Sequence, residues 1–427
     1  MLEKIISLGD GVEGLFVQNS RFNTTSVSFN FYLPMTKEKV AHNALLPFVL
    51  TSCSKDYPDF TSLNLKLNKL YGAKLDASCE KYGDCQLLRM RISVIDDKFS
   101  LDGDSLILQA SDLLLNLIFN PNVQDGRFNE VDINREKRKA IEHIKGEIAE
   151  KRIYAKNRLI AEMFKGTPYG IPKCGTVEDV EAVTAESLYK AWQDMLASAF
   201  VRVHIVGNTV PSKFFDAIKE RFEGISRCDI TDCKICKAAQ KVDKVNTVFE
   251  KMDVKQGKLV MGFSSDVYGD DDLSLPLLVM CDIFGGGPYS RLFTNVREKM
   301  SLCYYCSASS VRYKGLLTVD SGVEVENADK AVDEILNQLE IMKKGEFSDS
   351  EFDSSIKSIC DSLNTYYDSQ NSLDLWYALK INNHNLYSPE DIIEKIKAIT
   401  KEDVIYAARG VNLHTVYKLL PKEGVIC

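Results

Sequence analysis

Apolar and polar residues alternate along TSVSFNFYLP (residues 25–34), a period of two that is typical of a strand with one buried face. Residues 43–73 carry the apolar spacing of a helix, a loop and a second helix, and they end in a turn. Two further strand patterns follow in KLDASCEKYGD (74–84) and QLLRMRISVI (86–95). The first part of the chain is therefore predicted to run strand, helix, helix, strand, strand.

The same order returns in the second half of the chain. Its strand, its two helices and its pair of strands are predicted over residues 258–267, 274–287, 289–300 and 304–324. Pro276 in the first of these helices corresponds to Pro47, and the turn at Gly315 falls where Gly83 does. This repetition predicts an internal duplication.

The ends of the two halves also match. A long charged helix is predicted at 129–152 and another at 349–369. Each is followed by a pair of helices whose first residues have the spacing of a capping box, at Thr176, Thr184, Ser388 and Thr400. Each half then closes with an apolar strand, residues 201–208 and 413–421.

These patterns predict an α+β protein made of two duplicated halves, each a largely antiparallel sheet with helices packed on one face. The N-terminal half spans residues 1–225 and the C-terminal half residues 246–427. Between them, residues 226–245 lose the apolar period and are predicted to form a linker.

Composition and charge narrow the class of protein. With 427 residues and 45% hydrophobic content, the chain has enough apolar material for packed cores. It carries 53 Lys and Arg against 61 Asp and Glu, and no basic run that would follow a phosphate backbone, so a nucleic-acid partner is not expected. The first residues, MLEKIISLGDGVEGLF, contain no apolar stretch of signal-peptide or membrane-span length. We therefore expect a cytoplasmic protein without a membrane partner.

The cysteines include two CxxC spacings, Cys233 to Cys236, with Cys228 upstream, and Cys303 to Cys306. Such spacings are found in zinc knuckles and in redox pairs. We favour reduced thiols packed in the core, because residues i and i+3 of a strand point to opposite faces. The first spacing also lacks a second cysteine pair at zinc-ribbon distance. Whether Cys228, Cys233 and Cys236 bind a metal stays open.

Arg297 and Tyr304 are the candidate catalytic residues. They lie seven residues apart, at the end of a predicted helix and the start of a predicted strand. The guanidinium keeps its charge and the phenol is protonated at neutral pH, so both groups are hydrogen-bond donors. Rigid donors of this kind can hold a carbonyl oxygen that is becoming an oxyanion. The alternative is an exposed helix arginine and a tyrosine buried in a sheet.

The segment GGGPYSRLFTNVREKMSLCYYCSAS (285–309) and the duplicated α+β order resemble the M16 metallopeptidases, the family of insulin-degrading enzyme, pitrilysin and the mitochondrial processing peptidase. The resemblance covers essentially the whole chain and implies halves of the LuxS/mitochondrial processing peptidase-like fold. It also implies that Arg297 and Tyr304 bind the carbonyl of a peptide substrate. It places Gly285, Gly286 and Gly287 at the family's glycine-rich turn, close to the substrate.

The sequence departs from that family at its zinc motif. The five residues that match the family's inverted His-x-x-Glu-His run from Asn43 to Pro47, and its ligand and base positions hold Asn43, Leu46 and Pro47. None of these can bind Zn²⁺ or activate water as the motif does. The histidines show no compensating ligand spacing; they are His42, His143, His204, His384 and His414. Acidic residues where the third ligand would come from are Glu142, Glu147 and Glu150, and we expect them to form a solvated helix face.

The resemblance and the lost motif together imply a non-zinc subunit. We expect no cofactor in this chain and zinc on a sibling chain, the two forming a heterodimer that cleaves peptides or unfolded segments. A homodimer of the isolated chain stays open. The alternative function is a non-catalytic scaffold or binding subunit of the same fold, in which the Arg and Tyr are a relic.

Overall fold

A computed structural model describes residues 3–211, 213–233, 242–267, 271–380 and 386–422 of the chain. It divides into two compact units, each built mainly from one half of the sequence. The N-terminal unit contains Met1–Lys145, Ile171–Lys234 and Ser369–Ile381, and the C-terminal unit contains Gly146–Gly170, Ile235–Asp368 and Asn382–Cys427. The division at 234 lies inside the predicted linker. Each unit also takes in one short segment from the other half of the sequence.

The N-terminal unit is built on a six-stranded sheet of order β1-β2-β8-β3-β5-β4. Its strands are β1 (Glu3–Gly9), β2 (Val12–Gln18), β8 (Phe200–Gly207), β3 (Thr24–Pro34), β5 (Cys85–Ile95) and β4 (Lys74–Tyr82). Only the pairing of β2 with β8 is parallel among these strands. The hairpin of β1 and β2 was not anticipated from the sequence.

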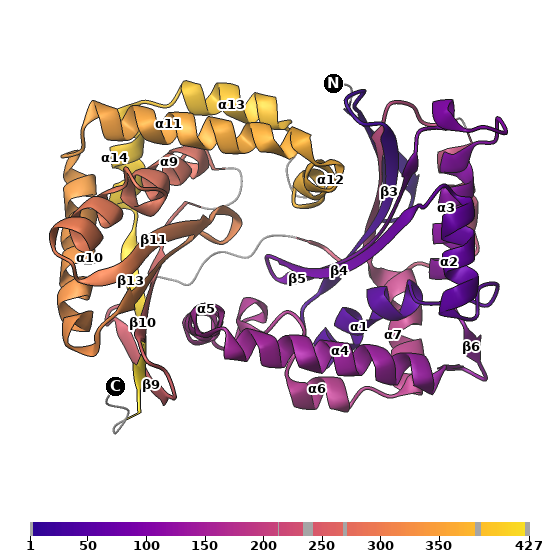
Figure 1. Cartoon of the computed structure of the whole chain (residues 1–427), viewed down its shortest axis with the longest axis horizontal. Coiled ribbons are helices and arrows are strands. Elements are labelled where there is room, and N and C mark those ends of the chain that lie inside the picture. Colours follow the sequence, from indigo (N-terminus) through magenta and orange to yellow (C-terminus); the bar gives the residue numbers. More distant parts are fainter. Residues whose placement is uncertain (1–2, 212, 234–241, 268–270, 381–385, 423–427) are drawn as a thin grey trace. The chain divides into compact units, whose positions relative to one another are not determined.

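Alternation along β3 separates the two faces of this sheet. Val27, Phe29 and Phe31 are buried in one apolar core, whereas Ser28 and Asn30 point to the other face. Helices cover the apolar face (Figure 1). They are α1 (Val40–Leu50), α2 (Phe60–Lys69), α3 (Leu106–Phe119), α6 (Val177–Glu181), α7 (Ala185–Ser198) and α8 (Phe214–Glu223), and α4 (Glu130–Ala149) begins in the same unit.

The C-terminal unit repeats this plan. Its five-stranded sheet has the order β11-β12-β10-β13-β9, which matches β4-β5-β3-β8-β2 strand for strand. The strands are β11 (Cys303–Val311), β12 (Leu316–Val323), β10 (Gly257–Ser264), β13 (Asn412–Pro421) and β9 (Asn246–Met252). Here too one pair is parallel, β13 with β9. The shared strand order confirms the predicted duplication.

Helices line one face of this second sheet as well (Figure 1). They are α9 (Ser274–Gly285), α10 (Ala328–Lys344), α11 (Asp349–Asn364), α13 (Pro389–Lys397) and α14 (Lys401–Arg409). The predicted capping boxes are present at Thr176, Thr184, Ser388 and Thr400. The two hairpin glycines have the same left-handed φ of 56°, at Gly83 and Gly315, so the turn chemistry is repeated too.

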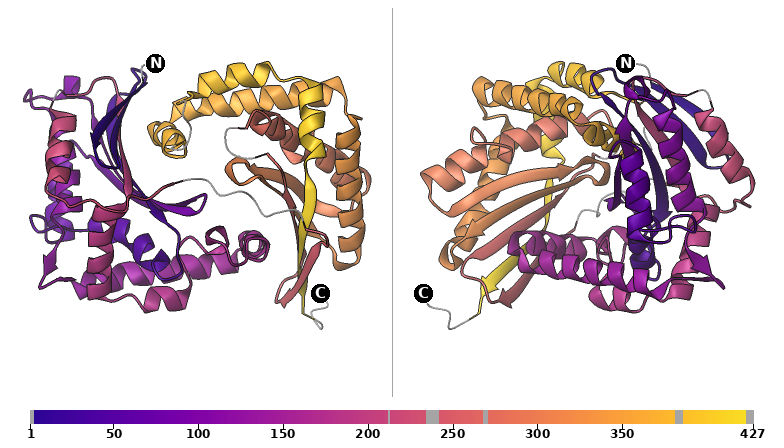
Figure 2. Two further views of the ribbon diagram at one scale, coloured as in Figure 1. Left: turned by 180° about the vertical axis from the view of Figure 1, so that it is seen from behind. Right: turned by 45° about the vertical axis from the view of Figure 1, so that its right-hand side comes forward.

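Two helices are exchanged between the halves of the sequence. Helix α5 (Lys151–Met163) follows α4 in the first half but packs on β10 and β13 in the C-terminal unit. Helix α12 (Gln370–Ala378) follows α11 in the second half but packs on β3 and β8 in the N-terminal unit. Figure 2 shows the helices and sheets of each unit from two further directions. The predicted long helix at 129–152 therefore ends earlier, and Glu150 caps the start of α5.

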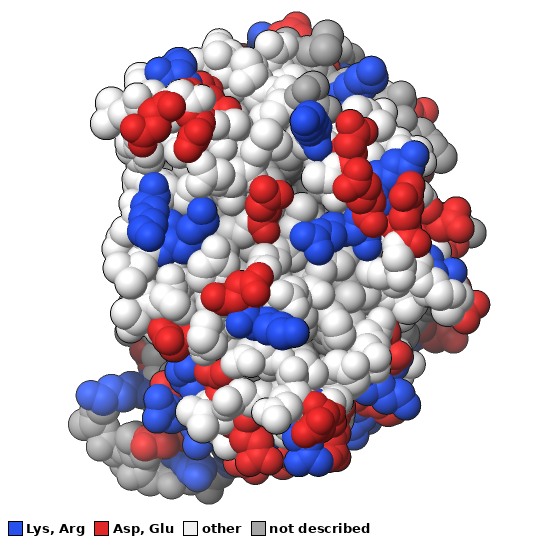
Figure 3. All heavy atoms as spheres, turned by 90° about the vertical axis from the view of Figure 1, so that its right-hand side faces the viewer, with Lys and Arg blue, Asp and Glu red and all other residues white. Residues whose placement is uncertain are grey.

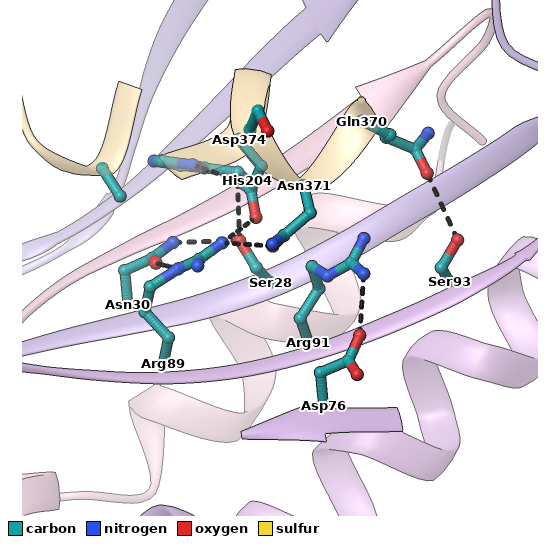
Figure 4. A network of polar contacts seen from close by, with 12 residues as sticks. Ser28, Asn30, Asp76, Arg89, Arg91, Ser93, His204, Gln370, Asn371 and Asp374 are labelled. Carbon is teal, nitrogen blue, oxygen red and sulfur yellow. Dashed lines mark hydrogen bonds and ion pairs between the residues drawn. The ribbon is translucent and has the colours of Figure 1, made fainter. Parts of the chain in front are cut away.

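Each exchanged helix is held to the polar face of its sheet by ion pairs. In the N-terminal unit, Asp374 of α12 lies 2.6 Å from the Arg89 guanidinium on β5, and both side chains are buried (Figure 4). In the C-terminal unit, Arg152 and Lys156 of α5 pair with Asp320 on β12. Cys85, the first residue of β5, pairs with Pro34, the last residue of β3, and Arg89 lies four residues further along β5. Leu316, the first residue of β12, pairs with Ser264, the last residue of β10, and Asp320 lies four residues further along β12. The two sheets thus carry opposite charges at equivalent positions.

On the face of the molecule drawn in Figure 3, Lys and Arg side chains are interspersed with Asp and Glu, and neither sign forms a continuous patch. Within the ranges that the structure describes, no helix combines the length and the apolar character needed to cross a membrane.

Candidate functional site

Arg297 lies on a π-helical segment, η3 (Leu292–Lys299), where the sequence predicted an ordinary helix. The wider turn continues past its end, since the amides of Met300 and Leu302 donate to the carbonyls of Asn295 and Val296, each at 3.1 Å. Ser301 then takes a left-handed φ of 51°. π-helical turns are rare and occur frequently at functional sites. This local geometry sets the direction of the Arg297 side chain at the end of the helix.

Tyr304 lies at a β-bulge in β11. Cys303 pairs with Val323 and Tyr305 pairs with Gly322, so two steps along β11 match one step along β12. Tyr304 is the extra residue, and 59% of its surface is exposed. A bulge redirects the side chain of the inserted residue, and bulges are enriched next to active sites. The tyrosine is therefore not buried in the sheet, which was the alternative that the sequence left open.

Both donors are at the surface of the C-terminal unit. The Tyr304 hydroxyl donates a hydrogen bond of 2.6 Å to Oε1 of Glu324, and this bond raises the pKa of the phenol above its usual value. Nε of Arg297 lies 3.5 Å from Oε1 of Glu298, and its guanidinium lies 4.6 Å from the centre of the Phe293 ring. The positive charge of Arg297 also contributes to lowering the pKa of Cys303, the residue before Tyr304.

The three glycines lie at the end of α9, before η3. A Cβ on Gly285 would lie 2.5 Å from the amide nitrogen of Ala308, so glycine at this position lets α9 approach the strand that carries Tyr304. A Cβ on Gly286 would overlap Oδ1 of Asp282, which belongs to α9 itself. A Cβ on Gly287 would meet the ring of Tyr289. Contact of Gly285, Gly286 and Gly287 with a substrate stays a prediction.

At the zinc-motif positions, the side chains of α1 are hydrogen-bonded or packed within the protein. Nδ2 of the buried Asn43 donates to Oε1 of Gln86 at 3.1 Å. Nε2 of Gln86 in turn donates to the carbonyls of Val40, at 2.9 Å, and Lys173, at 2.8 Å. Leu46 belongs to the apolar core, and Pro47 is buried inside the helix. The first motif position is thus satisfied by an amide pair, and the other two hold apolar groups.

The histidines are dispersed through the fold. His42 bonds Oγ of Ser187 at 2.9 Å, His204 bonds Asp374 at 2.7 Å, and His414 bonds Thr415 at 2.8 Å. His143 is exposed on α4, and His384 lies outside the described residues. Among the described residues, no group of three or more His, Cys, Asp or Glu side chains could hold a metal ion.

The acidic residues of α4 include one that the sequence did not single out. Glu142 and Glu150 are exposed and Glu147 is half-buried. Glu136 is buried on the same helix, and its Oε1 pairs with Nε of Arg135 at 2.9 Å and with Nζ of Lys139 at 3.0 Å. The polar sequence around it gave no signal of this burial.

The cysteine pairs differ from the sequence expectation. Cys228 is exposed, Cys233 is buried with its thiol donating to the Thr231 carbonyl at 3.8 Å, and Cys236 lies outside the described residues. The assignment of Cys303 and Cys306 to opposite faces is wrong, because the bulge at Tyr304 adds a residue between them. Cys303 pairs with Val323 and Cys306 with Ser321, two residues apart on β12 and therefore on one face.

The purified chain alone should contain no stoichiometric zinc, because the positions of Asn43, Leu46 and Pro47 supply no ligand. Metal analysis by mass spectrometry after gel filtration measures this directly. A variant with Cys228, Cys233 and Cys236 replaced by Ser is the matched control. One tightly bound zinc per chain that disappears in the control would contradict the prediction and place the metal at those cysteines.

Comparison with known proteins agrees with this geometry. The model of the peptidase M16 inactive domain matches residues 182–359. The "Probable inactive metalloprotease YmfF" of Bacillus subtilis is 32% identical over 419 residues, 97% of each chain. The "Uncharacterized zinc protease YmxG" of the same bacterium is 25% identical over 272 residues, 62% of each chain.

A solved structure extends the match to the whole fold. A conserved protein from Enterococcus faecalis superposes with a TM-score of 0.92 at 25% identity, over 98% of this chain and 99% of that one. The similarity in sequence and fold thus spans nearly the whole chain, and with it both duplicated units. The chain belongs to the peptidase M16 family, as a member whose zinc-motif positions carry no metal ligand.

Proposed function

We propose that this chain is the substrate-carbonyl-binding subunit of a two-chain zinc peptidase. One observation carries the proposal: the half-buried Arg297 and the exposed Tyr304 are donors on a π-helical turn and a β-bulge, in a chain whose zinc-motif positions are filled by an amide pair and apolar groups. A purely structural subunit has no need of two accessible donors on irregular backbone. Such backbone is retained where it positions functional side chains.

The role of the pair follows from its chemistry. In a peptide held against β11, the Arg297 guanidinium and the Tyr304 hydroxyl would donate to the oxygen of the scissile carbonyl. Both hydrogen bonds strengthen as negative charge develops on that oxygen. The side chains at positions 43, 46 and 47 do not fit a zinc ion, so in the proposal the metal and the attacking water belong to a sibling chain.

Glu324 gives the resting position of the phenol. In the free chain the Tyr304 hydroxyl donates to Glu324, and it would exchange this acceptor for the substrate carbonyl. The exchange replaces one hydrogen bond by another, so the phenol is never left without an acceptor. The chain therefore holds its donor ready without burying an unsatisfied group.

The relatives support a two-chain arrangement. One bacterium, Bacillus subtilis, has a relative of this chain named as an inactive metalloprotease and another named as a zinc protease. Proteins with both kinds of name thus belong to one organism, as the proposal requires of the organism that makes this protein.

Reconstitution tests the proposal. The chain is mixed with the sibling from its own genome that carries His-x-x-Glu-His, and cleavage of a library of unstructured peptides is measured for each chain alone and for the mixture. We expect activity in the mixture only, with about one zinc per pair. The matched control is a sibling with Glu→Gln in its motif, which should remain bound and inactive. A tight complex that cleaves nothing, or a sibling that is fully active alone, would replace this proposal with the scaffold function.

A further inference from the structure

The bulge at Tyr304 brings two cysteines of β11 together. Cys303 and Cys306 lie opposite Val323 and Ser321, which are two residues apart on β12. At a rise of about 3.3 Å per residue, these two partner positions on β12 are roughly 6.6 Å apart, so a disulfide between Cys303 and Cys306 requires β11 to bend until the two Cβ atoms are within about 4.5 Å. β11 is an edge strand that is paired only with β12, so a small adjustment disturbs one ladder of hydrogen bonds. The two thiols are thus placed to react with each other.

The two thiols differ in accessibility. Cys303 is half-buried at the end of the strand, next to the exposed Tyr304, whereas Cys306 is buried. The two side chains are near enough for each thiol to shift the pKa of the other. An accessible sulfur backed by a buried one is the arrangement of an attacking and a resolving cysteine.

The surroundings of Cys303 favour its thiolate. The hydrogen bond from Cys306 outweighs the effect of burial and, with the Ser321 hydroxyl and the charge of Arg297, lowers the pKa of Cys303 to about 7. Burial instead raises the pKa of Cys53 to about 11 and that of Cys281 to about 12. A thiol whose pKa is near the ambient pH combines a large thiolate fraction with good nucleophilicity. The pKa of Cys303 is therefore shifted in the opposite direction from that of these two core cysteines.

We propose that Cys303 and Cys306 form a thiol-modification site that closes to a disulfide by exchange with low-molecular-weight disulfides such as oxidised glutathione. The Cys303 thiolate attacks the small disulfide, forming a mixed disulfide and releasing one small thiolate. The Cys306 sulfur, as it loses its proton, then attacks Cys303 and releases the second small thiolate. In total, two protein thiols are oxidised, one small disulfide is reduced to two thiols, and the protons pass to the released thiolates.

Closure would act on the peptide-binding segment. The bond would tie the two residues that flank Tyr304 and Tyr305 into one small ring, and it would remove the thiolate beside Arg297. If the chain binds substrate carbonyls as proposed above, the oxidised form should be the less active one. The modification itself does not depend on that function, because it requires only the isolated chain.

The experiment treats the isolated native chain with oxidised glutathione at neutral pH and follows it by intact mass and peptide mapping. A Cys228→Ser background removes an exposed competing thiol. We expect one intramolecular disulfide, mapped to Cys303 and Cys306, which is reversed by reduced glutathione. Cys306→Ser should stop at a stable glutathione adduct on Cys303, and Cys303→Ser should leave Cys306 unmodified over the same time.

Two results would overturn the proposal. One is modification of Cys303 at a rate no faster than that of the half-buried Cys360, which serves as the internal reference. The other is a wild-type chain that stops at the same adduct as Cys306→Ser, because the buried thiol would then not reach its partner. Circular dichroism of each variant excludes unfolding as the cause. Disulfide formation is measured on the isolated chain, and peptide cleavage is measured on the reconstituted pair. A loss of cleavage with the oxidised chain would therefore concern the peptidase function and not the reaction of Cys303 with Cys306.

Discussion

Tyr304→Phe should lower the turnover number of the reconstituted pair by roughly 10²–10³-fold, equivalent to about 3–4 kcal/mol of transition-state stabilisation. The substitution removes one hydroxyl from an exposed side chain on a bulge, where that hydroxyl donates to Glu324, itself at the surface. We therefore expect the fold and the affinity for the sibling chain to be unchanged. The loss should appear in kcat, because the hydrogen bond strengthens only as charge develops on the carbonyl oxygen.

Arg297→Ala should reduce turnover at least as much, since the remaining phenol carries no charge. Two control variants match these changes in position and exposure. Lys299→Ala removes a cation from the same π-helical segment, and Tyr406→Phe removes a hydroxyl from an exposed tyrosine on α14. Both controls should keep the turnover of the unmodified pair.

Binding of each variant to the sibling chain, measured by calorimetry, separates loss of chemistry from loss of assembly. Full activity of Tyr304→Phe in a pair that cleaves peptides would make the tyrosine structural. An equal loss in the Lys299→Ala control would point instead to damage of the segment as a whole.

Much of the fold could be predicted because its signals are local. The capping boxes require only two side chains a few residues apart, and four of them were identified from the sequence, whereas those that begin at Asp59 and Ser348 were not. The hairpin glycines at 83 and 315 are set by the turn alone. The duplication followed from the order of such local elements, so it did not depend on any long-range contact.

The irregular backbone at the candidate site could not be predicted in the same way. A bulge is a mismatch in register between two strands, and the sequence of β11 alone contains no mark of it. For this reason the sequence placed Cys303 and Cys306 on opposite faces. The residues Arg297 and Tyr304 were found through the resemblance to a family, whereas their exposure and the contact with Glu324 needed the structure.

The sequence also could not predict that α5 and α12 each pack on the sheet of the other half. Helices α5 and α12 have ordinary helical patterns, and nothing local says which sheet each will cover. Their choice depends on pairs such as Arg89 with Asp374, which are 285 residues apart in the chain. A buried arginine and a buried aspartate look like surface residues until their partner is known.

Asp374→Ala should destabilise the N-terminal unit by about 3–5 kcal/mol, because it leaves a buried charge without its partner. The carboxylate accepts from Arg89, from Nδ1 of His204 at 2.7 Å and from Ser28 at 2.9 Å, so three groups lose their acceptor together (Figure 4). Burial alone would raise the pKa of Asp374, but Arg89 and His204 outweigh it and hold the pKa well below its usual value. The group is therefore ionised, and its loss leaves Arg89 uncompensated.

Urea unfolding followed by tryptophan fluorescence measures the free energy of unfolding of the N-terminal unit. The chain has two tryptophans, Trp192 and Trp376, and both lie in the N-terminal unit. Trp376 is on α12 itself, so a Trp376→Phe background leaves Trp192 to report the rest of the unit. If α12 detaches before the sheet unfolds, the unfolding curve of the protein with both tryptophans will differ from that of the Trp376→Phe background.

Asp368→Ala, at an exposed position just before α12, is the control and should change the free energy of unfolding by less than about 0.5 kcal/mol.

The same series tests why each helix covers the sheet that it does. Asp374→Lys should destabilise the unit more than Asp374→Ala, since it sets a second cation against Arg89 as a basic helix such as α5 would. The double variant Arg89→Leu with Asp374→Leu should cost less than the sum of the two single changes, because no charge is then left unpaired. Equal costs for Ala and Lys at position 374, or strict additivity in the double variant, would mean that packing rather than charge selects the helix. The opposite charges at equivalent positions of the two sheets would then have no part in the exchange.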